Sequence, residues 1–457
     1  KDSPVPKIAI AGSGIASTSA TNMSKTSATV YTFTYTVPSG DGTGTVSLSN
    51  GQDLSGNSIT SSPSSGASFT VDNTSPTAAI TYSPSGPYKQ GDSVTITATF
   101  NESMKDSPVP QIAIAGSGIA STSATNMNKT SATVYTFTYT VPSGDGTGTV
   151  SLSNGQDLSD NVIVSTPSSG ATFTVDNTAP TAAITYSPSG PYKQNDSVTI
   201  TATFNESMKD SPVPKIEIAG SGIASTSATN MSKTSATVYT FTYTVPSGDG
   251  TGTISLSNGQ DLSGNSITSS PSSGASFTVD NTSPTLSSVS IASNNSTNTL
   301  AKANDVVTLT FTASETIGTP TVTFLSGGDS IQDSSITYNN TSGNTWTAAY
   351  TVHSSDTDGS VTYSIAFTDT SGNNGNAVTS GFGSVTVDTT LPTLSSVSIA
   401  SNNSTNTLAE ANDVVTLTFT ASETIGTPTV TFLSGGDSIQ DSSITYNNTS
   451  GNTWTAA

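Results

Sequence analysis

The chain of 457 residues contains no cysteine and no arginine, and it has a single histidine. Without cysteine it has no disulfide framework, no thiolate metal ligand and no thiol nucleophile. Its eleven cations are all lysines and are outnumbered by 31 acidic residues, which gives a net charge of −20. The chain therefore lacks the clustered cations that neutralise nucleic-acid phosphates. No run approaches the ~20 apolar residues that span a bilayer. We therefore expect no nucleic-acid partner and no membrane insertion of this segment.

Charged and hydrophobic residues are both scarce, at 9% and 32% of the chain. A composition rich in Ser, Thr, Asn and Gly can indicate disorder, but disordered chains usually lack regular apolar alternation. Here the alternation is regular: in residues 133–141, "TVYTFTYTV", every second side chain from Tyr135 onward is large and apolar. The pattern therefore predicts a folded chain of β-strands.

Two families of internal repeats account for the whole length. The phrase "KDSPVP" opens at Lys1, Lys105 and Lys209, a period of 104 residues, and a second family that starts near residue 283 has a period of 108. Each copy ends in a proline-closed heptad such as "VDNTSPT". Cutting at these heptads predicts five domains: 1–74, 75–178, 179–282, 283–390 and 391–457. The first is expected to lack its opening and the last its close, as in part of a longer polypeptide.

The copies within each family are nearly identical. Residues 1–77 and 209–285 differ only where Ala9 becomes Glu217 and Val46 becomes Ile254. Position 9 lies between two isoleucines of an expected strand and so faces water, which tolerates the charge. Such copies indicate a duplicated spacer, since an active site is rarely needed in many adjacent copies.

The complete repeat 75–178 shows period-two alternation in six segments separated by turn residues, with no helical period. The six expected strands are 78–82, 93–100, 110–116, 133–141, 148–154 and 171–176. A seventh is expected within 120–129. Seven short strands in a repeat of this length predict an all-β immunoglobulin-like sandwich, repeated in tandem as an elongated rod. A parallel β-helix is disfavoured because its rungs recur every ~20–30 residues.

Three phrases of the first family, "TITATFNESM", "NGQDLSGN" and "FTVDNTAPT", resemble successive signatures of prokaryotic Ig-like repeats. The second family shows the resemblance in "TFTASETI", "FTDTSGN" and "VTVDTTLPT". Proteins with such repeats include giant cell-surface adhesins, surface-layer proteins and extracellular fibre proteins. The resemblance implies a secreted, extended array that serves adhesion, surface coating or extension, often with calcium at the domain junctions.

The sandwich topology places acidic residues from three segments at each junction: the linker heptad, the turn after 93–100 and the loop after 148–154. The predicted sets are Asp72, Glu102 and Asp157; Asp176, Glu206 and Asp261; and Asp280, Glu315 and Asp369. Asp388 and Glu423 begin a fourth set. Converging carboxylates suit Ca²⁺, which takes about six to eight oxygen ligands, and a bound ion would stiffen the junction. The alternative is that these Asp and Asn side chains only form turns by bonding nearby backbone groups.

Catalysis is not expected. His353 lies in an expected turn and has no Gly-x-Ser-x-Gly elbow to accompany it, and "AGSGIAS" at 11–17 lacks the rest of a phosphate loop. Trp346 lies in an alternating strand, which favours a place in the core over a carbohydrate platform. Asn-x-Ser/Thr sequons, such as those at Asn101 and Asn205, are candidate glycan acceptors in a secreted glycoprotein.

The sequence therefore predicts a non-enzymatic structural protein of the cell surface, a rigid rod in a fibre, surface layer or adhesin stalk. Its expected partners are like copies of itself, in a filament or lattice, or a cell-surface or glycan partner. The alternative is an adhesin whose Ig-like domains bind a glycan or host protein directly, for which divergent loops would be the sign. A linker in a larger enzyme is a third reading.

Overall fold

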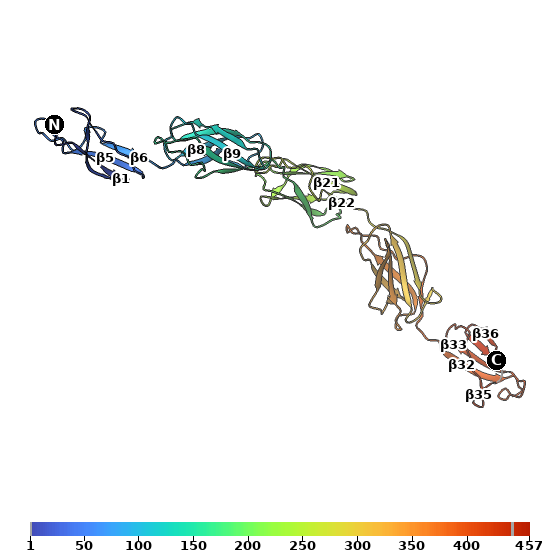
Figure 1. The fold of residues 1–457 in the computed structure, drawn as a ribbon. Helices are drawn as coiled ribbons and strands as arrows, with labels where there is room; N and C mark the ends of the chain where they lie inside the picture. The colour runs from blue at the N-terminus through green and yellow to red at the C-terminus, as the bar shows by residue number, and fades with distance from the viewer. Residues whose placement is uncertain (1, 440–442) are drawn as a thin grey trace. The chain divides into compact units, whose positions relative to one another are not determined.

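The computed structural model describes residues 2–439 and 443–457, and these residues form strands and loops with no helix (Figure 1). They divide into two compact units. One holds the residues up to Gly190 together with Gln194–Val279, and the other holds Pro191–Lys193 and Asp280–Ala457. This division does not separate the five repeats from one another, so the five boundaries stay predictions.

Repeat 75–178 forms two four-stranded sheets whose paired strands are antiparallel. Their orders are β11-β12-β8-β7 and β10-β9-β13-β14. The strands are β7 Ala78–Ser83, β8 Ser93–Phe100, β9 Gln111–Ser117, β10 Thr122–Asn126, β11 Asn128–Lys129, β12 Val134–Thr140, β13 Gly146–Ser153 and β14 Thr172–Val175. This is the strand order of an immunoglobulin-like sandwich, and the predicted tandem Ig-like fold is confirmed.

The expected seventh strand is two short strands. β10 belongs to one sheet and β11 to the other, and Met127 between them is 3% exposed. The chain therefore crosses from sheet to sheet at Met127, whose side chain enters the core as it does so. This gives eight strands where about seven were predicted.

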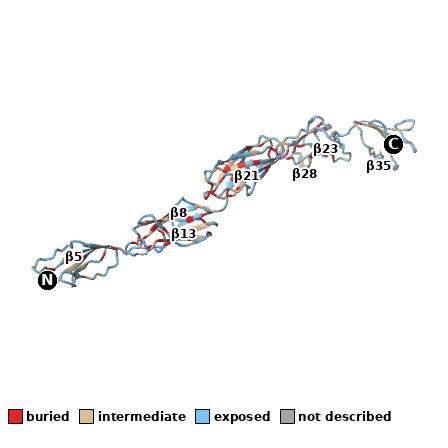
Figure 2. Ribbon diagram, turned by 90° about the horizontal axis from the view of Figure 1, so that it is seen from above, coloured by how far each residue is buried: buried red, intermediate tan, exposed pale blue. Residues whose placement is uncertain are grey.

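The core forms because alternate side chains of each strand point between the sheets. In β8 the inward residues Val94, Ile96, Ala98 and Phe100 are at most 3% exposed, whereas Thr95 faces solvent. Burial of each large apolar side chain contributes about 1.5–3 kcal/mol. Buried residues accordingly lie inside the sandwiches, and exposed residues cover the outer faces (Figure 2).

A glycine in β13 makes room for an aromatic ring of the core. A Cβ atom on Gly148 would lie 2.2 Å from Cζ of Phe173, a distance at which no side chain fits. The Phe173 ring makes edge contacts with Tyr82, Tyr88 and Tyr139. The "GTG" at the start of the strand therefore allows one ring to join both sheets.

Repeat 179–282 has the same two sheets, in the orders β15-β16-β20-β19 and β18-β17-β21-β22. Its strands are β15 Ala182–Ser187, β16 Ser197–Phe204, β17 Lys215–Ser221, β18 Thr226–Asn230, β19 Ser232–Lys233, β20 Val238–Thr244, β21 Gly250–Ser257 and β22 Ser276–Val279. Glu217 is exposed, as the substitution at this position predicted, and Ile254 is 2% exposed.

Repeat 283–390 forms the sheets β23-β25-β29-β28 and β24-β31-β30-β26-β27. Its strands are β23 Leu286–Ser293, β24 Leu300–Ala301, β25 Val306–Ala313, β26 Thr321–Ser326, β27 Asp329–Ser330, β28 Thr337–Ser342, β29 Thr345–Thr351, β30 Gly359–Ala366 and β31 Thr386–Val387. Trp346 is partly buried and packs against the core of this repeat.

The two outer repeats each contain one four-stranded and one two-stranded sheet among the described residues. The strands of 1–74 are β1 Lys7–Ser13, β2 Thr18–Asn22, β3 Ser24–Lys25, β4 Tyr31–Thr32, β5 Gly42–Ser49 and β6 Ser68–Val71; those of 391–457 are β32 Leu394–Ser401, β33 Val415–Ala421, β34 Leu433–Ser434, β35 Asp437–Ser438, β36 Tyr446–Ser450 and β37 Thr453–Ala456. Val37 is 55% exposed, whereas its equivalent Val141 is 2% exposed, because residues 1–74 hold no counterpart of β7 and β8 to cover it.

Candidate metal centres at the repeat junctions

Two of the three predicted carboxylates at each junction are brought together by an isolated β-bridge. Met104, in the turn that follows β8, pairs with Asp157, in the loop that follows β13. Glu102 lies two residues before Met104, so the bridge places Glu102 close to Asp157. The same bridge joins Met208 to Asp261 and Ile317 to Asp369.

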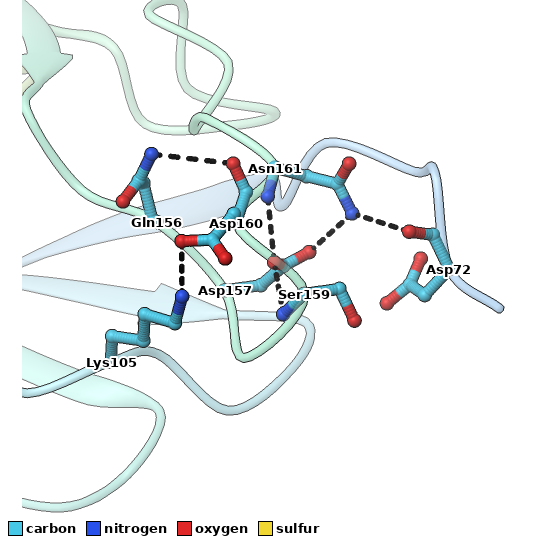
Figure 3. A network of polar contacts seen from close by, with 7 residues as sticks. All are labelled: Asp72, Lys105, Gln156, Asp157, Ser159, Asp160 and Asn161. Atoms are coloured by element: carbon cyan, nitrogen blue, oxygen red, sulfur yellow. Dashed lines mark hydrogen bonds and ion pairs between the residues drawn. The ribbon is translucent and has the colours of Figure 1, made fainter. Parts of the chain in front are cut away.

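The loop after β13 is shaped by its own aspartate. Oδ1 of Asp157 accepts hydrogen bonds from the backbone N–H groups of Ser159 and Asn161, at 2.7 and 2.8 Å. Oδ2 accepts one from the Asn161 side-chain amide, at 2.8 Å (Figure 3). The carboxylate is only 1% exposed. The turn-forming role that the sequence left as an alternative is therefore present, and it places the carboxylate at the junction.

The same asparagine holds the linker. Nδ2 of Asn161 also donates to the backbone oxygen of Asp72, at 3.0 Å, so the side chain lies between the loop and the heptad (Figure 3). Asn265 donates to the backbone oxygen of Asp176 and Asn373 to that of Asp280, both at 2.8 Å. Each linker aspartate is thereby fixed beside the other two carboxylates.

All nine predicted residues lie in three groups, each with its ligand atoms within 4.8 Å of one another. The groups are Asp72, Glu102 and Asp157; Asp176, Glu206 and Asp261; and Asp280, Glu315 and Asp369. Each contributes carboxylate oxygens only, with no nitrogen or sulfur ligand. The two residues of the fourth set, Asp388 and Glu423, also interact directly.

The electrostatics of the groups favour a cation. Burial, together with the charges of Asp176 and Asp261, raises the pKa of Glu206 to about 7. Burial and the neighbouring Asp72 and Asp157 raise the pKa of Glu102 in the same way. Like charges crowded in a partly buried place disfavour ionisation. An oxygen-binding cation of high charge would relieve this repulsion.

Asn73, the residue after the linker aspartate Asp72, hydrogen-bonds to the preceding repeat. The Asn73 amide donates to Gly40 O, at 2.6 Å, and its backbone N–H to Asp41 Oδ1, at 2.5 Å. Thr74 Oγ1 also bonds Asp41. Neighbouring side chains in an extended chain project to opposite sides, so Asn73 faces away from the side that Asp72 faces. Asn73 therefore clamps the heptad to the repeat before it.

This clamp recurs. Asp145 binds Asn177 and Thr178 of the next heptad, and Asp358 binds Thr389 and Thr390 of the last one. Hydrogen bonds from the heptad lower the pKa of each clamping aspartate. The sequence reasoning missed these aspartates, although the "SGDG" turn that carries two of them recurs in each copy of the first family.

The ring of the single histidine contacts a nearby serine. His353 Nδ1 lies 2.7 Å from Ser355 Oγ, only two residues away, and Asp356 Oδ2 accepts a hydrogen bond from the His353 backbone N–H. Among the described residues, no helix is long and apolar enough to cross a membrane.

The strand order of the complete repeats defines a tandem array of immunoglobulin-like domains. Residues 236–382 match the family described as bacterial Ig-like domain (group 3). The resemblance to prokaryotic Ig-like repeats is thereby confirmed, and the match points to a non-enzymatic protein of the cell surface or extracellular space.

Solved structures with similar folds include tandem arrays of several kinds. The Escherichia coli adhesin FdeC is 14% identical, with 68% of this chain and 96% of that chain covered and a TM-score of 0.34. A tetra-tandem repeat from the extending region of a large adhesion protein is 20% identical, with 84% of this chain and 92% of that chain covered and a TM-score of 0.26. The titin fragment I67–I69 is 14% identical, with 68% of this chain and 98% of that chain covered and a TM-score of 0.26. No curated protein matches the chain.

Proposed function

We propose that this chain is a structural spacer of the cell surface, in which tandem Ig-like repeats extend a fibre, surface layer or adhesin stalk. In this proposal each junction is stiff, and the repeats keep a set separation from their neighbours. The observation that carries it is the recurrence of the same three-carboxylate group at three successive junctions, each within 4.8 Å. A catalytic centre would not need three equivalent copies along one chain.

Stiffness without any ion has two sources. The heptad at residues 71–77 is hydrogen-bonded on one side to Asp41 and on the other to Asn161. Its proline fixes one backbone dihedral angle and further limits the motion of the linker. The same pairs of contacts, with Asp145 and Asn265, hold the heptad at residues 175–181.

Calcium would add a third source. Three carboxylates supply oxygen ligands only, and Ca²⁺ accepts such ligands in flexible numbers and completes its shell with water. The raised pKa of Glu206 supports the proposal, because it reflects burial of the carboxyl and its repulsion by Asp176 and Asp261, and a bound cation would offset both. An ion held by residues of both repeats would stabilise the ordered junction by linkage.

Calcium binding is tested by titration calorimetry of the full chain at pH 7.5. We expect about three ions per chain, one for each group. The triple variant Asp157→Asn, Asp261→Asn and Asp369→Asn should lose this binding. A matched control is the double variant Asp106→Asn and Asp210→Asn, whose exposed carboxylates pair with Lys129 and Lys233 and belong to none of the three groups. Absence of calcium binding to the unaltered chain would contradict the calcium proposal.

We further propose that like copies of the chain, or a glycan or cell-surface partner, bind at the outer sheet faces. Thr81 and Thr136 lie opposite Thr97 on the two sides of β8, which gives a row of hydroxyl and methyl groups across one sheet. Thr185, Thr201 and Thr240 form the equivalent row in the next repeat. A partner that binds one row would find it again one period later. Sedimentation at increasing concentration tests self-association.

A further inference from the structure

Each complete first-family repeat carries a lysine that reaches the repeat after it. Nζ of Lys89 donates a hydrogen bond to the backbone oxygen of Gly264, at 2.7 Å, although the two residues are 175 positions apart. One period later, Nζ of Lys193 donates to the backbone oxygen of Gly372, at 2.6 Å. Both members of each pair lie within one compact unit of the structure.

The lysine is held at the exit of its own repeat. Tyr88, just before it, pairs in parallel with Val175, and its backbone oxygen accepts the N–H of Asp176, at 2.8 Å. The backbone N–H of Lys89 donates to Asp92 Oδ2, at 3.0 Å, which closes the turn. The lysine backbone therefore lies beside the linker aspartate of the following junction.

The accepting loop has a glycine where the lysine arrives. Gly264 has φ of +92° and Gly372 has φ of +88°, a conformation that favours glycine. A Cβ atom on Gly264 would lie 3.0 Å from Nζ of Lys209 in the same repeat and 3.4 Å from Nζ of Lys89, and one on Gly372 would lie 3.1 Å from Nζ of Lys193. Both the backbone conformation and the space beside the lysine amine therefore favour glycine here.

Repeat 75–178 has a different residue at this loop position. Asp160 replaces the glycine, keeps a φ of +75° and forms an ion pair with Lys105 of its own repeat. In the two following repeats the loop carries glycine, and its backbone oxygen accepts a hydrogen bond from a lysine of the repeat before it.

The second family varies at the lysine itself. Ala301 and Lys302 occupy the places of Tyr88 and Lys89, since Ala301 pairs in parallel with Val387 and the Lys302 N–H donates to Asp305. The equivalent of Lys302 in the last repeat is Glu410, and this is the one difference between residues 286–349 and 394–457. Glu410 keeps the same turn, because its N–H donates to Asp413 Oδ2 at 2.8 Å. The substitution therefore changes the chemistry of the side chain and preserves its placement.

We propose that this position is an interdomain latch: a lysine here fastens the glycine-containing loop of the next repeat, and a glutamate here leaves the junction unlatched. The partner it fits is a following Ig-like repeat whose loop presents a free backbone carbonyl beside a glycine. An ammonium group donates to such a carbonyl, whereas a carboxylate is an acceptor only. A junction with the lysine would therefore be stiffer than a junction with the glutamate. The latch rests on the proposed spacer function but requires no calcium.

The first test is amine reactivity in the full chain. Lys89 and Lys193 are half-buried and Lys302 is exposed, so Lys302 is a built-in reference in the same type of turn. Under limiting acetylation we expect Lys89 and Lys193 to react about three- to tenfold more slowly than Lys302, as a mostly formed charge-assisted hydrogen bond requires. Mass spectrometry separates the two sites, because Lys89 precedes "QGD" and Lys193 precedes "QND". Equal rates at all three lysines would overturn the latch.

The second test measures the junction itself. The chain has no cysteine, so Thr138→Cys and Thr242→Cys place a unique pair of spin labels on exposed equivalent sites of two adjacent repeats. Lys89→Met keeps the aliphatic stem and removes the donor, and Lys89→Glu reproduces the natural change. Both should broaden the label-to-label distance distribution, whereas Lys302→Met should leave it unchanged.

Both calcium states are measured so that the two proposals can fail separately. A distribution that Lys89→Met broadens in chelator, with or without a further effect of calcium on the unaltered chain, supports the latch. A distribution that Lys89→Met leaves unchanged in both states overturns it. Calcium sensitivity of the unaltered chain tests the ion proposal independently.

Discussion

The crowded carboxylates make a prediction whose sign depends on pH. Glu206→Gln keeps the shape of the side chain and removes its charge. The folded-state pKa of Glu206 is about 7 against an ordinary value of 4.5, which corresponds to roughly 3 kcal/mol at full value. Solvent screening at this partly exposed carboxyl reduces the figure to about 1–2 kcal/mol. In chelator at pH 8 the variant should be more stable than the unaltered chain by that amount.

The sign follows from proton linkage. Between pH 4.5 and 7 the folded state holds a proton that the unfolded state has lost, so stability falls as pH rises through this window. Above pH 7 the destabilisation is complete, and below pH 4.5 both states are protonated and it disappears. The advantage of Glu206→Gln should therefore be full at pH 8 and absent at pH 4.

Hydrogen exchange with mass spectrometry measures this in the full chain. Peptides that contain Glu217 or Ile254 differ in sequence from their counterparts in the other copies, so they report on repeat 179–282 alone. At pH 8 their protection should increase about 5- to 30-fold in the variant. Glu217→Gln, an exposed acidic residue of the same repeat, is the matched control and should change little. An equal gain at pH 4 and pH 8, or no gain at pH 8, would refute the argument from repulsion.

Three further changes test the junction and the core. Asn161→Ala removes the amide that bonds a buried carboxylate and the linker, and should cost about 2 kcal/mol in thermal or chemical unfolding of its repeat. Hydrogen bonds from the heptad lower the pKa of Asp145, so its clamp should be present at neutral pH and lost as the pH falls through that lowered value. Asp145→Asn should therefore speed amide hydrogen exchange at Asn177 at neutral pH and remove the acid sensitivity of this exchange. Ile96→Ala should cost about 2–4 kcal/mol because the side chain is fully buried, whereas Thr97→Ala on the outer face should stay within about 0.5 kcal/mol in the same unfolding assay.

Most of the fold of one repeat could be predicted because the strands alternate strictly. In residues 93–100 the apolar side chains fall on one face, and the structure buries the same face. The polar segment 120–129 has no such alternation, so its division into β10 and β11 could not be read from it. What decides that division is the burial of Met127 between the two sheets, a tertiary effect.

The convergence of the nine carboxylates could also be predicted, because sandwich topology decides which loops share an end. The clamp at Asp145 and the latch at Lys89 could not, since each depends on where one repeat meets the next. No local pattern marks such a contact. The change of Lys302 to Glu410 between otherwise identical copies was the one signal of the latch, and only the structure shows where that position lies.

The central claim is that the junction carboxylates bind calcium and thereby stiffen the array. Small-angle X-ray scattering of the full chain, first with calcium and then with chelator, tests it most directly, with the Asp157→Asn, Asp261→Asn and Asp369→Asn variant as reference. We predict that chelation shortens the maximum dimension and increases the flexibility of the unaltered chain and has no effect on the variant. Identical scattering in the two conditions would contradict the claim.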